Sequence, residues 1–361
     1  MPDCELGGVE VNVKKEIAVI FGGQSSEHEV SCKSVMNVLN HMDTDMYNIH
    51  RIGITKEGRW LFVKDSKSIE DGSWREGTVQ AIISPDSQDH GMLLIAEDSC
   101  RCVHIDVAYP VLHGLMGEDG TIQGLFELSG IPYVGCGVLS SSVSMDKIST
   151  KIFVDRLGIR QAKYVVDIER DTRNIEDTMN QVEETLGYPV FVKPSNAGSS
   201  QGVSKAQNRD ELAEAITLAK QHDHRVLIEE NIVGREIECA VLGGDDPKAS
   251  RIGEVLAAAE FYDFDAKYNN DESRTIVDPQ MPEQVKEEVR EDAVKVFKAV
   301  SGYGLSRVDF FVEKDTNQVV FNEINTLPGF TSISMYPMLW EDMGLSKSEL
   351  IDAIIETAYT R

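Results

Sequence analysis

Long apolar runs are absent from this chain, and no segment approaches the roughly 20 residues that a membrane-spanning helix needs. Residues 1–15 also lack the charged-then-apolar layout of a signal peptide, so we expect them to form a poorly ordered lead. The six cysteines show neither zinc-site spacing nor a disulfide framework, which is typical of a reducing compartment. We therefore expect a cytoplasmic protein that does not enter a membrane.

Basic residues are also in short supply. The chain of 361 residues has 35 lysines and arginines against 61 aspartates and glutamates, a net charge of −26. Nucleic-acid-binding proteins carry a basic footprint, and anionic membrane surfaces attract basic segments, so we expect neither partner. An anionic substrate would have to meet positive side chains that are clustered locally.

The common nucleotide-binding and catalytic motifs are missing as well. The chain contains no G-x-x-x-x-G-K-[ST], G-x-G-x-x-G, H-E-x-x-H or C-x-x-C pattern. A glycine–serine loop from Ala197 to Gly202 is present, and the backbone N–H groups of such a loop can cradle phosphates. Phosphate handling is therefore still expected, but through an unusual arrangement.

The first region reads as one α/β domain over residues 16–135. Residues 16–21 form a continuous apolar run, which is typical of a buried parallel strand, and a glycine turn and a helical pattern follow it. Ser26 and Glu29 have the spacing of a capping box at the start of that helix. Strand-like runs at 47–54, 104–113 and 131–135 complete the domain.

Two further regions follow, at 136–233 and 234–361. The first has a predicted helix over 145–158, strands over 162–168, 189–195 and 226–230, and an amphipathic helix over 210–223. The second has strands over 237–243 and 252–257, a polar segment, and a helix with Pro282 in its first turn and one apolar face.

The most informative segment runs from Arg307 to Asn325 and reads RVDFFVEKDTNQVVFNEIN. Two short strands are joined by a polar turn, which predicts a hairpin. If the strands pair about Thr316, Asp309 lies opposite Glu323, and directly opposed side chains point to the same face. Residues two apart on one strand also share a face.

The hairpin is therefore predicted to have one polar and one apolar face. The polar face holds Arg307, Asp309, Glu323 and Asn325; the apolar face holds Val308, Phe310, Val312, Val320 and Ile324. Two carboxylates and an amide oxygen suit Mg²⁺, whose coordination is usually completed by phosphate oxygens. An adjacent arginine suits a phosphate or a developing oxyanion.

At this point several separated motifs, in order, resemble the D-alanine–D-alanine ligases of the ATP-grasp superfamily, which include the ligases of vancomycin resistance. The motifs are GGQSSEHEVS, LHGLMGEDGTIQG, SMDKISTK, VKPSNAGSSQG, FYDFDAKY, SRVDFF and NEINTLPGFTSIS, and the resemblance spans residues 16–356. It implies a Rossmann-like (pre-ATP-grasp) N-terminal domain followed by a two-lobed ATP-grasp fold, with a lid at 260–276.

The resemblance also implies the reaction. The γ-phosphoryl group of ATP moves to the carboxylate of one D-alanine, and the amine of a second amino acid attacks the resulting acyl phosphate for peptidoglycan precursor synthesis. Such chemistry needs charge neutralisation, positioning and the exclusion of water. ATP, two Mg²⁺ ions with Mn²⁺ as an alternative, a monovalent cation such as K⁺, and a homodimer belong to this expectation.

The resemblance assigns roles around the phosphates. Asp309, Glu323 and Asn325 match metal ligands, Arg307 matches an arginine at the tetrahedral intermediate, and Gly329 matches the backbone N–H beside it. The matches that reach ATP phosphates or adenosine are Lys147, Lys193, Ser200, Lys267, Glu229, Glu236 and Ile232.

It also assigns the amino-acid sites. Glu29 matches the carboxylate that holds the first D-alanine, and Ser199 and Tyr268 match its partners in a hydrogen-bonded triad. His113 matches a histidine near the acyl phosphate. The second amino-acid pocket matches at Ser334 and Met335.

Met335 bears on the choice of substrate. D-serine ligases of the resistance type carry an arginine at this position, and methionine offers no hydrogen bond to a hydroxyl group, so D-alanine is favoured. Three alternatives stay open: a D-alanine–D-serine ligase, another ATP-grasp carboxylate–amine ligase, and a non-catalytic nucleotide-binding module.

Overall fold

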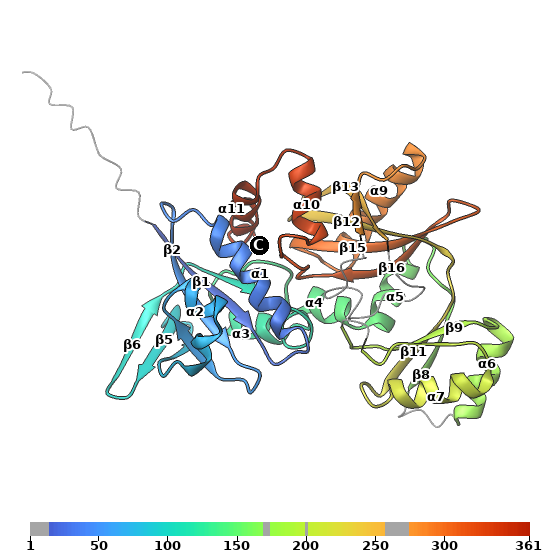
Figure 1. Cartoon of the computed structure of the whole chain (residues 1–361), viewed down its shortest axis with the longest axis horizontal. Helices are drawn as coiled ribbons and strands as arrows, with labels where there is room; N and C mark the ends of the chain where they lie inside the picture. Colours follow the sequence, from blue (N-terminus) through green and yellow to red (C-terminus); the bar gives the residue numbers. More distant parts are fainter. Residues whose placement is uncertain (1–13, 169–173, 199–200, 257–273) are drawn as a thin grey trace, which may run out of the picture.

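The computed structural model describes residues 14–168, 174–198, 201–256 and 274–361, arranged around three β-sheets (Figure 1). The predicted lead at 1–15 and lid at 260–276 lie largely outside these ranges. Among the described residues, no helix is both long and apolar enough to cross a membrane.

The N-terminal sheet has seven strands in the order β6-β5-β4-β3-β2-β1-β7, and β1 runs parallel to both β2 and β7. The predicted strand at 16–21 is confirmed as β1, whose last six residues are all buried, as its continuous apolar run requires. The strands and helices of this region are β1 Lys15–Gly22, α1 His28–His41, β2 Tyr47–Ile54, β3 Trp60–Val63, α2 Ser66–Glu70, η1 Ser73–Glu76, β4 Gln80–Ile83, β5 Gly91–Ala96, β6 Ser99–His104, β7 Val107–Val111 and α3 Thr121–Ser129.

Two details of this region differ from the prediction. The prediction of a capping box at Ser26 and Glu29 is wrong, because α1 begins after Glu27 and no side chain caps it. Residues 131–135 form no full strand and contribute only a single bridge between Ala108 and Tyr133. The antiparallel strands β3 to β6 were not predicted, because they are short and β6 is largely exposed, so they lack a continuous apolar run.

The central sheet has four antiparallel strands in the order β10-β9-β11-β8. Helices α6 and α7 share its apolar core, where Leu212, Ile216 and Ala219 are fully buried, as the amphipathic pattern predicts. The elements that precede and form this region are α4 Val138–Met145, α5 Lys147–Asp155, β8 Tyr164–Ile168, α6 Ile175–Thr185, β9 Val190–Pro194, β10 Ser204–Ala206, α7 Arg209–Ala219 and β11 Arg225–Glu230.

The C-terminal sheet has five antiparallel strands in the order β14-β13-β12-β15-β16. Helix α9 begins directly after Pro282 and buries Val285, Val289, Ala293 and Val296 against this sheet, which confirms the predicted face. The elements are β12 Gly234–Gly243, β13 Lys248–Leu256, β14 Arg274–Val277, α9 Glu283–Ala299, β15 Gly304–Glu313, β16 Val319–Asn325, α10 Met335–Asp342 and α11 Lys347–Thr357.

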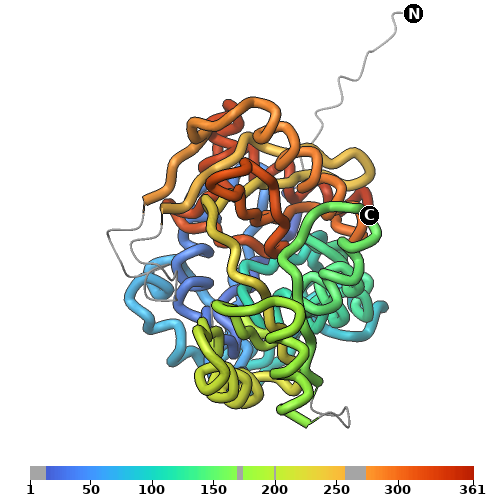
Figure 2. The backbone as a smooth tube through the Cα atoms, turned by 90° about the vertical axis from the view of Figure 1, so that its right-hand side faces the viewer, coloured from blue at the N-terminus to red at the C-terminus, as the bar shows by residue number. Residues whose placement is uncertain are grey.

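The end of the chain returns to its beginning. Helix α11 packs beside α1 (Figure 1), and its buried apolar residues share one core with those of β1 and β2. The Tyr47 hydroxyl donates to Asp352 at 2.9 Å, and Lys15 pairs with Glu356 at 2.7 Å. Figure 2 shows most of the C-terminal segments, in orange and red, above the green and yellow segments that contain β8–β11.

Candidate active site

A cavity of about 590 Å³ lies where the three regions meet. The N-terminal region contributes Glu27, His113 and Glu118 to its lining; β9 and β11 contribute Lys193 and Glu229. Carboxylates of the C-terminal sheet line the opposite wall: Glu236, Glu238, Glu254, Asp309 and Glu323. The cavity therefore brings together side chains from opposite ends of the chain, such as Glu27 and Glu323.

The β15–β16 hairpin has the predicted register at its functional end. Asp309 lies opposite Glu323 and Arg307 opposite Asn325. A bulge after Asp309 then shifts the pairing by one residue, so that Phe311 lies opposite Val320. The prediction for Val320 is therefore wrong: it shares a face with Phe311, because an extra residue in one strand reverses the alternation beyond it.

Arg307 is held in a buried ion-pair network. Its guanidinium donates to both oxygens of Asp309, each at 2.7 Å, and its Nε lies 3.2 Å from Glu238. Only about 7% of Arg307 is exposed. Such a two-point contact fixes the direction of the guanidinium, which a single contact would not.

The hairpin residues fit a divalent metal by their chemistry. The Asn325 amide nitrogen donates to Asp309 at 3.0 Å, which leaves its amide oxygen as a ligand beside the Asp309 and Glu323 carboxylates. These are hard oxygen ligands of the kind that Mg²⁺ prefers. Glu323 keeps 30% of its side chain exposed, so it can turn toward an ion without losing a packed position.

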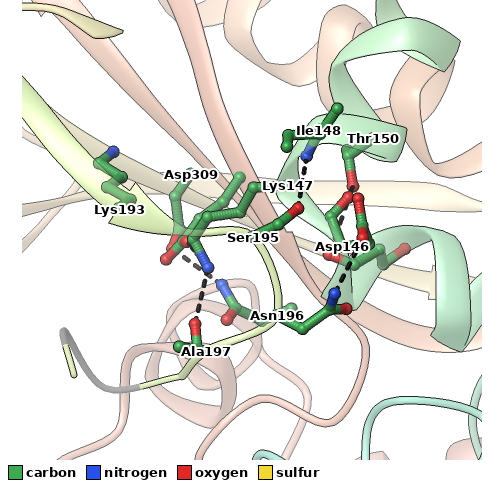
Figure 3. A network of polar contacts seen from close by, with 12 residues as sticks. Asp146, Lys147, Ile148, Thr150, Lys193, Ser195, Asn196, Ala197 and Asp309 are labelled. Atoms are coloured by element: carbon green, nitrogen blue, oxygen red, sulfur yellow. Dashed lines mark hydrogen bonds and ion pairs between the residues drawn. The ribbon is translucent and has the colours of Figure 1, made fainter. Parts of the chain in front are cut away.

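Two lysines reach the same cavity from the other side. The Lys147 ammonium group donates to the Ala197 carbonyl at 2.8 Å and lies 3.7 Å from Glu323. Figure 3 shows this contact, together with Ser195 and Asn196, which tie the loop to the start of α5. The loop that was expected to cradle phosphates is thus anchored at Lys147.

Lys193 belongs to a buried triad with Glu229 and Lys151. The two carboxylate oxygens of Glu229 lie 2.6 Å from Lys151 and 2.7 Å from Lys193. Burial alone would raise the pKa of Glu229, but the two ammonium groups outweigh it and hold that pKa at about 2. Burial likewise opposes the charge of Lys193, yet the pKa of Lys193 is raised because Glu229, with Glu323 and Glu236 farther off, stabilises its ammonium form.

The sequence did not single out Lys151. Only 2% of it is exposed, and it lies on α5 four residues after Lys147. A spacing of four places two residues on the same side of a helix, which is the signal that could have paired them. The spacing could not reveal its partner, Glu229, because that residue lies on strand β11, 78 positions farther along the chain.

The predicted hinge and adenosine residues lie at the junction of two sheets. Ile232 lies between β11 of the central sheet and β12 of the C-terminal sheet, and it lines the cavity. Glu236 also lines the cavity, near the start of β12.

The structure corrects the prediction for Glu29. Its side chain is 59% exposed and pairs with Lys56 at 2.9 Å and with Arg75 at 3.3 Å, outside the cavity. The carboxylate that enters the cavity is Glu27, which is only 7% exposed.

Helical geometry explains the correction. Glu27 precedes α1 by one position and is in phase with the buried stripe of Ser31, Ser34 and Val38, whereas Glu29 lies on the opposite side. Glu27 also fits between two glycines: a Cβ on Gly114 or on Gly198 would meet its carboxylate oxygen at 2.4 Å and 2.8 Å, respectively. The two residues after Gly198 are Ser199 and Ser200, which lie outside the described residues, as do Lys267 and Tyr268.

A cluster of metal-type ligands on α1 lies near this corrected site. Atoms of His28, Glu29 and Cys32 come within 4.8 Å of one another. The Arg75 guanidinium already lies among them, 3.2 Å from the His28 ring and 3.3 Å from Glu29. The cluster is therefore organised around an arginine.

His113 is buried and lines the cavity. Its Nδ1 lies 2.9 Å from the Leu327 carbonyl and its Nε2 lies 2.9 Å from the Ser34 hydroxyl. Because a carbonyl only accepts, Nδ1 carries the proton in this arrangement. The imidazole thus connects α1 to the loop that contains Gly329, which also lines the cavity.

The two residues predicted for the second amino-acid pocket differ in position. Ser334 lies against Gly329, since a Cβ on that glycine would meet the Ser334 hydroxyl at 3.0 Å. Met335 is 4% exposed and packs against Gly253 of β13. The described part of the cavity lining includes neither Ser334 nor Met335.

The chain is similar to known proteins over nearly its whole length. A family model described as "D-ala D-ala ligase N-terminus" matches residues 16–136, and one described as "D-ala D-ala ligase C-terminus" matches residues 153–356. The D-alanine–D-alanine ligase of Acetivibrio thermocellus is 51% identical over 96% of both chains, and that of Ruminiclostridium cellulolyticum is 49% identical over 96% of both.

Solved structures are similar over the same length. The VanG D-Ala:D-Ser ligase from Enterococcus faecalis is 38% identical with a TM-score of 0.86, covering 96% of this chain and all of that one. The D-alanine–D-alanine ligase from Coxiella burnetii is 36% identical with a TM-score of 0.84, covering 96% and 94%. The predicted ATP-grasp fold is thereby confirmed, and the chain belongs to the D-alanine–D-alanine ligase family.

Proposed function

We propose that this protein joins two D-alanine molecules into D-alanyl-D-alanine, with ATP as the phosphoryl donor and D-alanyl phosphate as the intermediate. One observation carries the proposal: within one cavity, lysines from α5 and β9 face a wall of carboxylates that includes Asp309 and Glu323. A triphosphate with its metal ions fits between two such walls, because the lysines attract the phosphate groups and the carboxylates attract the metal ions.

Lys147 and Lys193 would hold the phosphates of ATP. Each lysine now lies near a carboxylate, Lys147 at 3.7 Å from Glu323 and Lys193 at 2.7 Å from Glu229. A bound phosphate group would become an additional or alternative partner for each ammonium group. We assign the metal to Asp309, Glu323 and Asn325, with two Mg²⁺ ions as the natural complement and Mn²⁺ as a substitute; K⁺ is proposed as a monovalent activator. When bound, the metal neutralises charge on the transferring phosphoryl group.

The chain's own residues would then assist each bond change. The γ-phosphoryl group of ATP moves to a carboxylate oxygen of the first D-alanine, while its bond to the β-phosphate oxygen breaks and ADP leaves. The amine of the second D-alanine attacks the acyl carbon and forms an N–C bond as the nitrogen loses a proton. The C–O bond to the phosphate then breaks, and inorganic phosphate leaves with that oxygen. Arg307 and the Gly329 N–H are placed to stabilise the oxyanion that develops in this second step.

Glu27, rather than Glu29, would hold the ammonium group of the first D-alanine. It is the buried carboxylate of the motif that reaches the cavity, and it lies between the Gly114 turn and Gly198. In the family pattern Ser199 and Tyr268 complete this site, Lys267 and Ser200 reach the phosphates, and Ser334 contacts the second substrate. Glu236 and Ile232 would bind adenosine at the junction of the two sheets.

A phosphate-release assay tests the reaction. The purified protein is supplied with ATP and MgCl₂. D-alanine, D-serine and D-lactate are each added alone, D-serine and D-lactate are also added together with D-alanine, and the products are identified by mass. We expect phosphate and D-alanyl-D-alanine only when D-alanine is present. A dominant mixed product with D-serine would assign the alternative activity, and ATP binding without phosphate release would indicate a non-catalytic module.

We also propose that the protein acts in the cytoplasm, on a peptidoglycan precursor, and that it forms a homodimer. Each subunit would have an N-terminal domain at 16–135 and two ATP-grasp lobes at 136–233 and 234–361. Light scattering coupled to size exclusion would measure the oligomeric state. A monomer at working concentrations would contradict the homodimer without affecting the proposed reaction.

A further inference from the structure

Glu118 joins two loops that are far apart in the sequence. One of its carboxylate oxygens accepts the Gly114 N–H at 2.8 Å, and the other accepts the Leu327 N–H at 2.9 Å from a residue 209 positions away. Glu118 lines the cavity, and its sequence motif contributed only His113 to the predicted site. A carboxylate that accepts two backbone N–H groups makes strong, charge-assisted hydrogen bonds.

The N-terminal region holds the loop from Leu327 to Phe330 at backbone groups of both end residues, where Asn37 donates to the Phe330 carbonyl at 2.8 Å. Glu118 accepts from the Leu327 N–H, and His113 donates to the Leu327 carbonyl at 2.9 Å. The Ser34 hydroxyl accepts the Phe330 N–H at 3.3 Å. These contacts bracket Pro328 and Gly329, so the direction of the Gly329 N–H is set by residues of the N-terminal region.

We propose that Glu118 is a positioning residue that, as a carboxylate, holds the Leu327 backbone and thereby aims the Gly329 N–H at the reacting carbonyl group. This inference rests on the proposed role of Gly329. Glu118 itself touches neither the metal ligands nor the phosphate-binding lysines in the contacts described, and it would act through the loop. Its loss would leave the substrates bound but the oxyanion poorly stabilised.

The surroundings of Glu118 make this function dependent on pH. Burial raises the pKa of its carboxyl group to about 7, and the negative charge of Glu27 at the start of α1 adds to this. The Gly114 and Leu327 N–H groups and the Arg307 guanidinium of β15 act in the opposite direction. Below about pH 7 the carboxyl group therefore gains a proton, and its hydrogen bonds to the two N–H groups weaken.

The decisive variant is Glu118→Gln, which keeps the shape but replaces one accepting oxygen with an NH₂ group. We expect kcat for D-alanyl-D-alanine formation to fall by roughly ten- to a hundredfold, since a small misplacement of a catalytic group has effects of this size. KM for ATP should change less than about twofold, because the variant removes no interaction with the nucleotide. The decline of kcat below neutral pH should disappear.

Amide hydrogen exchange of residues 325–331, measured without substrates, gives an independent readout. Exchange in Glu118→Gln should be at least about tenfold faster, as expected when a hydrogen bond that protects a loop is lost. This measurement does not require the proposed reaction, so the positioning role can be tested even if the ligase assay fails. Wild-type exchange in this segment would overturn the inference, as would an unchanged kcat.

A neighbouring residue provides the matched control. Asp119 also accepts two backbone N–H groups, from Met116 at 2.8 Å and from Thr121 at 2.9 Å, but both lie in its own turn. Asp119→Asn should loosen that turn without faster exchange at 325–331. If both variants accelerate exchange equally, Glu118 has only a general structural role and the inference is wrong.

Discussion

The two walls of the cavity differ in the sign of their charge. On the C-terminal sheet, Arg307 is shared between Asp309 and Glu238, so the carboxylates are in excess. On the central side, Glu229 is shared between Lys151 and Lys193, so the ammonium groups are in excess. Each wall has a buried charge of one sign that is flanked by two of the other sign.

This difference explains how a chain with a net charge of −26 can bind a polyanion. The acidic wall suits a cation and the lysine wall suits phosphate, and both are buried enough for the charges to act strongly. Lys147 and Glu323, 3.7 Å apart, are the point at which the two walls meet. Local arrangement, and not overall charge, therefore decides what the cavity binds.

The largest effect is expected from breaking the acidic wall at its arginine. Arg307→Met should lower the rate of phosphate release by roughly a thousandfold, as is typical when a group that stabilises an oxyanion is lost. It should also lower the free energy of unfolding by about 3–5 kcal/mol, because Asp309 and Glu238 would stay buried without their partner. Urea denaturation and the ligase assay measure the two effects.

Glu323→Gln separates these two consequences. Its carboxylate is partly exposed, so we expect the free energy of unfolding to change by less than about 0.5 kcal/mol while turnover is lost. An active Glu323→Gln variant would contradict the metal assignment of the hairpin.

The next largest effect is expected from the lysine wall. Lys151→Met removes one of two hydrogen-bonded partners of Glu229, so the free energy of unfolding should fall by about 1.5–3 kcal/mol. The Kd for ATP should rise, because Lys193 then has to satisfy Glu229 alone and is less available to phosphate. Adding Glu229→Gln to Lys151→Met should recover part of the ATP affinity, as calorimetric titration would reveal; no recovery would contradict this charge-sharing account.

The same triad predicts how stability depends on pH. The pKa of Glu229 falls from its ordinary value of 4.5 to about 2 in the folded protein, so its contribution is fully present above pH 4.5. That contribution is lost as the pH falls from 4.5 toward 2. As the pH falls across this window, the free energy of unfolding should decrease more steeply for the wild type than for Glu229→Gln, as denaturation at a series of pH values would measure. Equal slopes would contradict the pairing of Glu229 with the two lysines.

The smallest effect is expected outside both walls. Glu29→Gln should leave D-alanine kinetics unchanged and alter stability by less than about 0.5 kcal/mol, because its ion pairs are largely exposed. Glu27→Gln, two residues earlier, should raise KM for D-alanine by roughly tenfold or more, the effect of losing one charged hydrogen bond. A larger increase in KM for Glu29→Gln than for Glu27→Gln would instead identify Glu29 as the residue that binds D-alanine.

Much of the fold could be predicted, because it depends on short-range patterns. The continuous apolar run of β1 and the apolar face of α9 each express the period of a single element. Opposition of Asp309 and Glu323 follows from one hairpin with a short turn. The antiparallel strands β3 to β6 could not be predicted, since their burial depends on neighbours that the local pattern does not identify.

The sequence by itself determined the residue types of the site, the hairpin register at Asp309 and the motifs that carry the family resemblance. Tertiary structure alone decided which glutamate of the first motif enters the cavity, because that depends on where α1 begins and which side it buries. It also decided the contact of Glu118 with Leu327 and of Lys151 with Glu229. Such contacts join elements that are far apart in the sequence, and no local periodicity carries information about them.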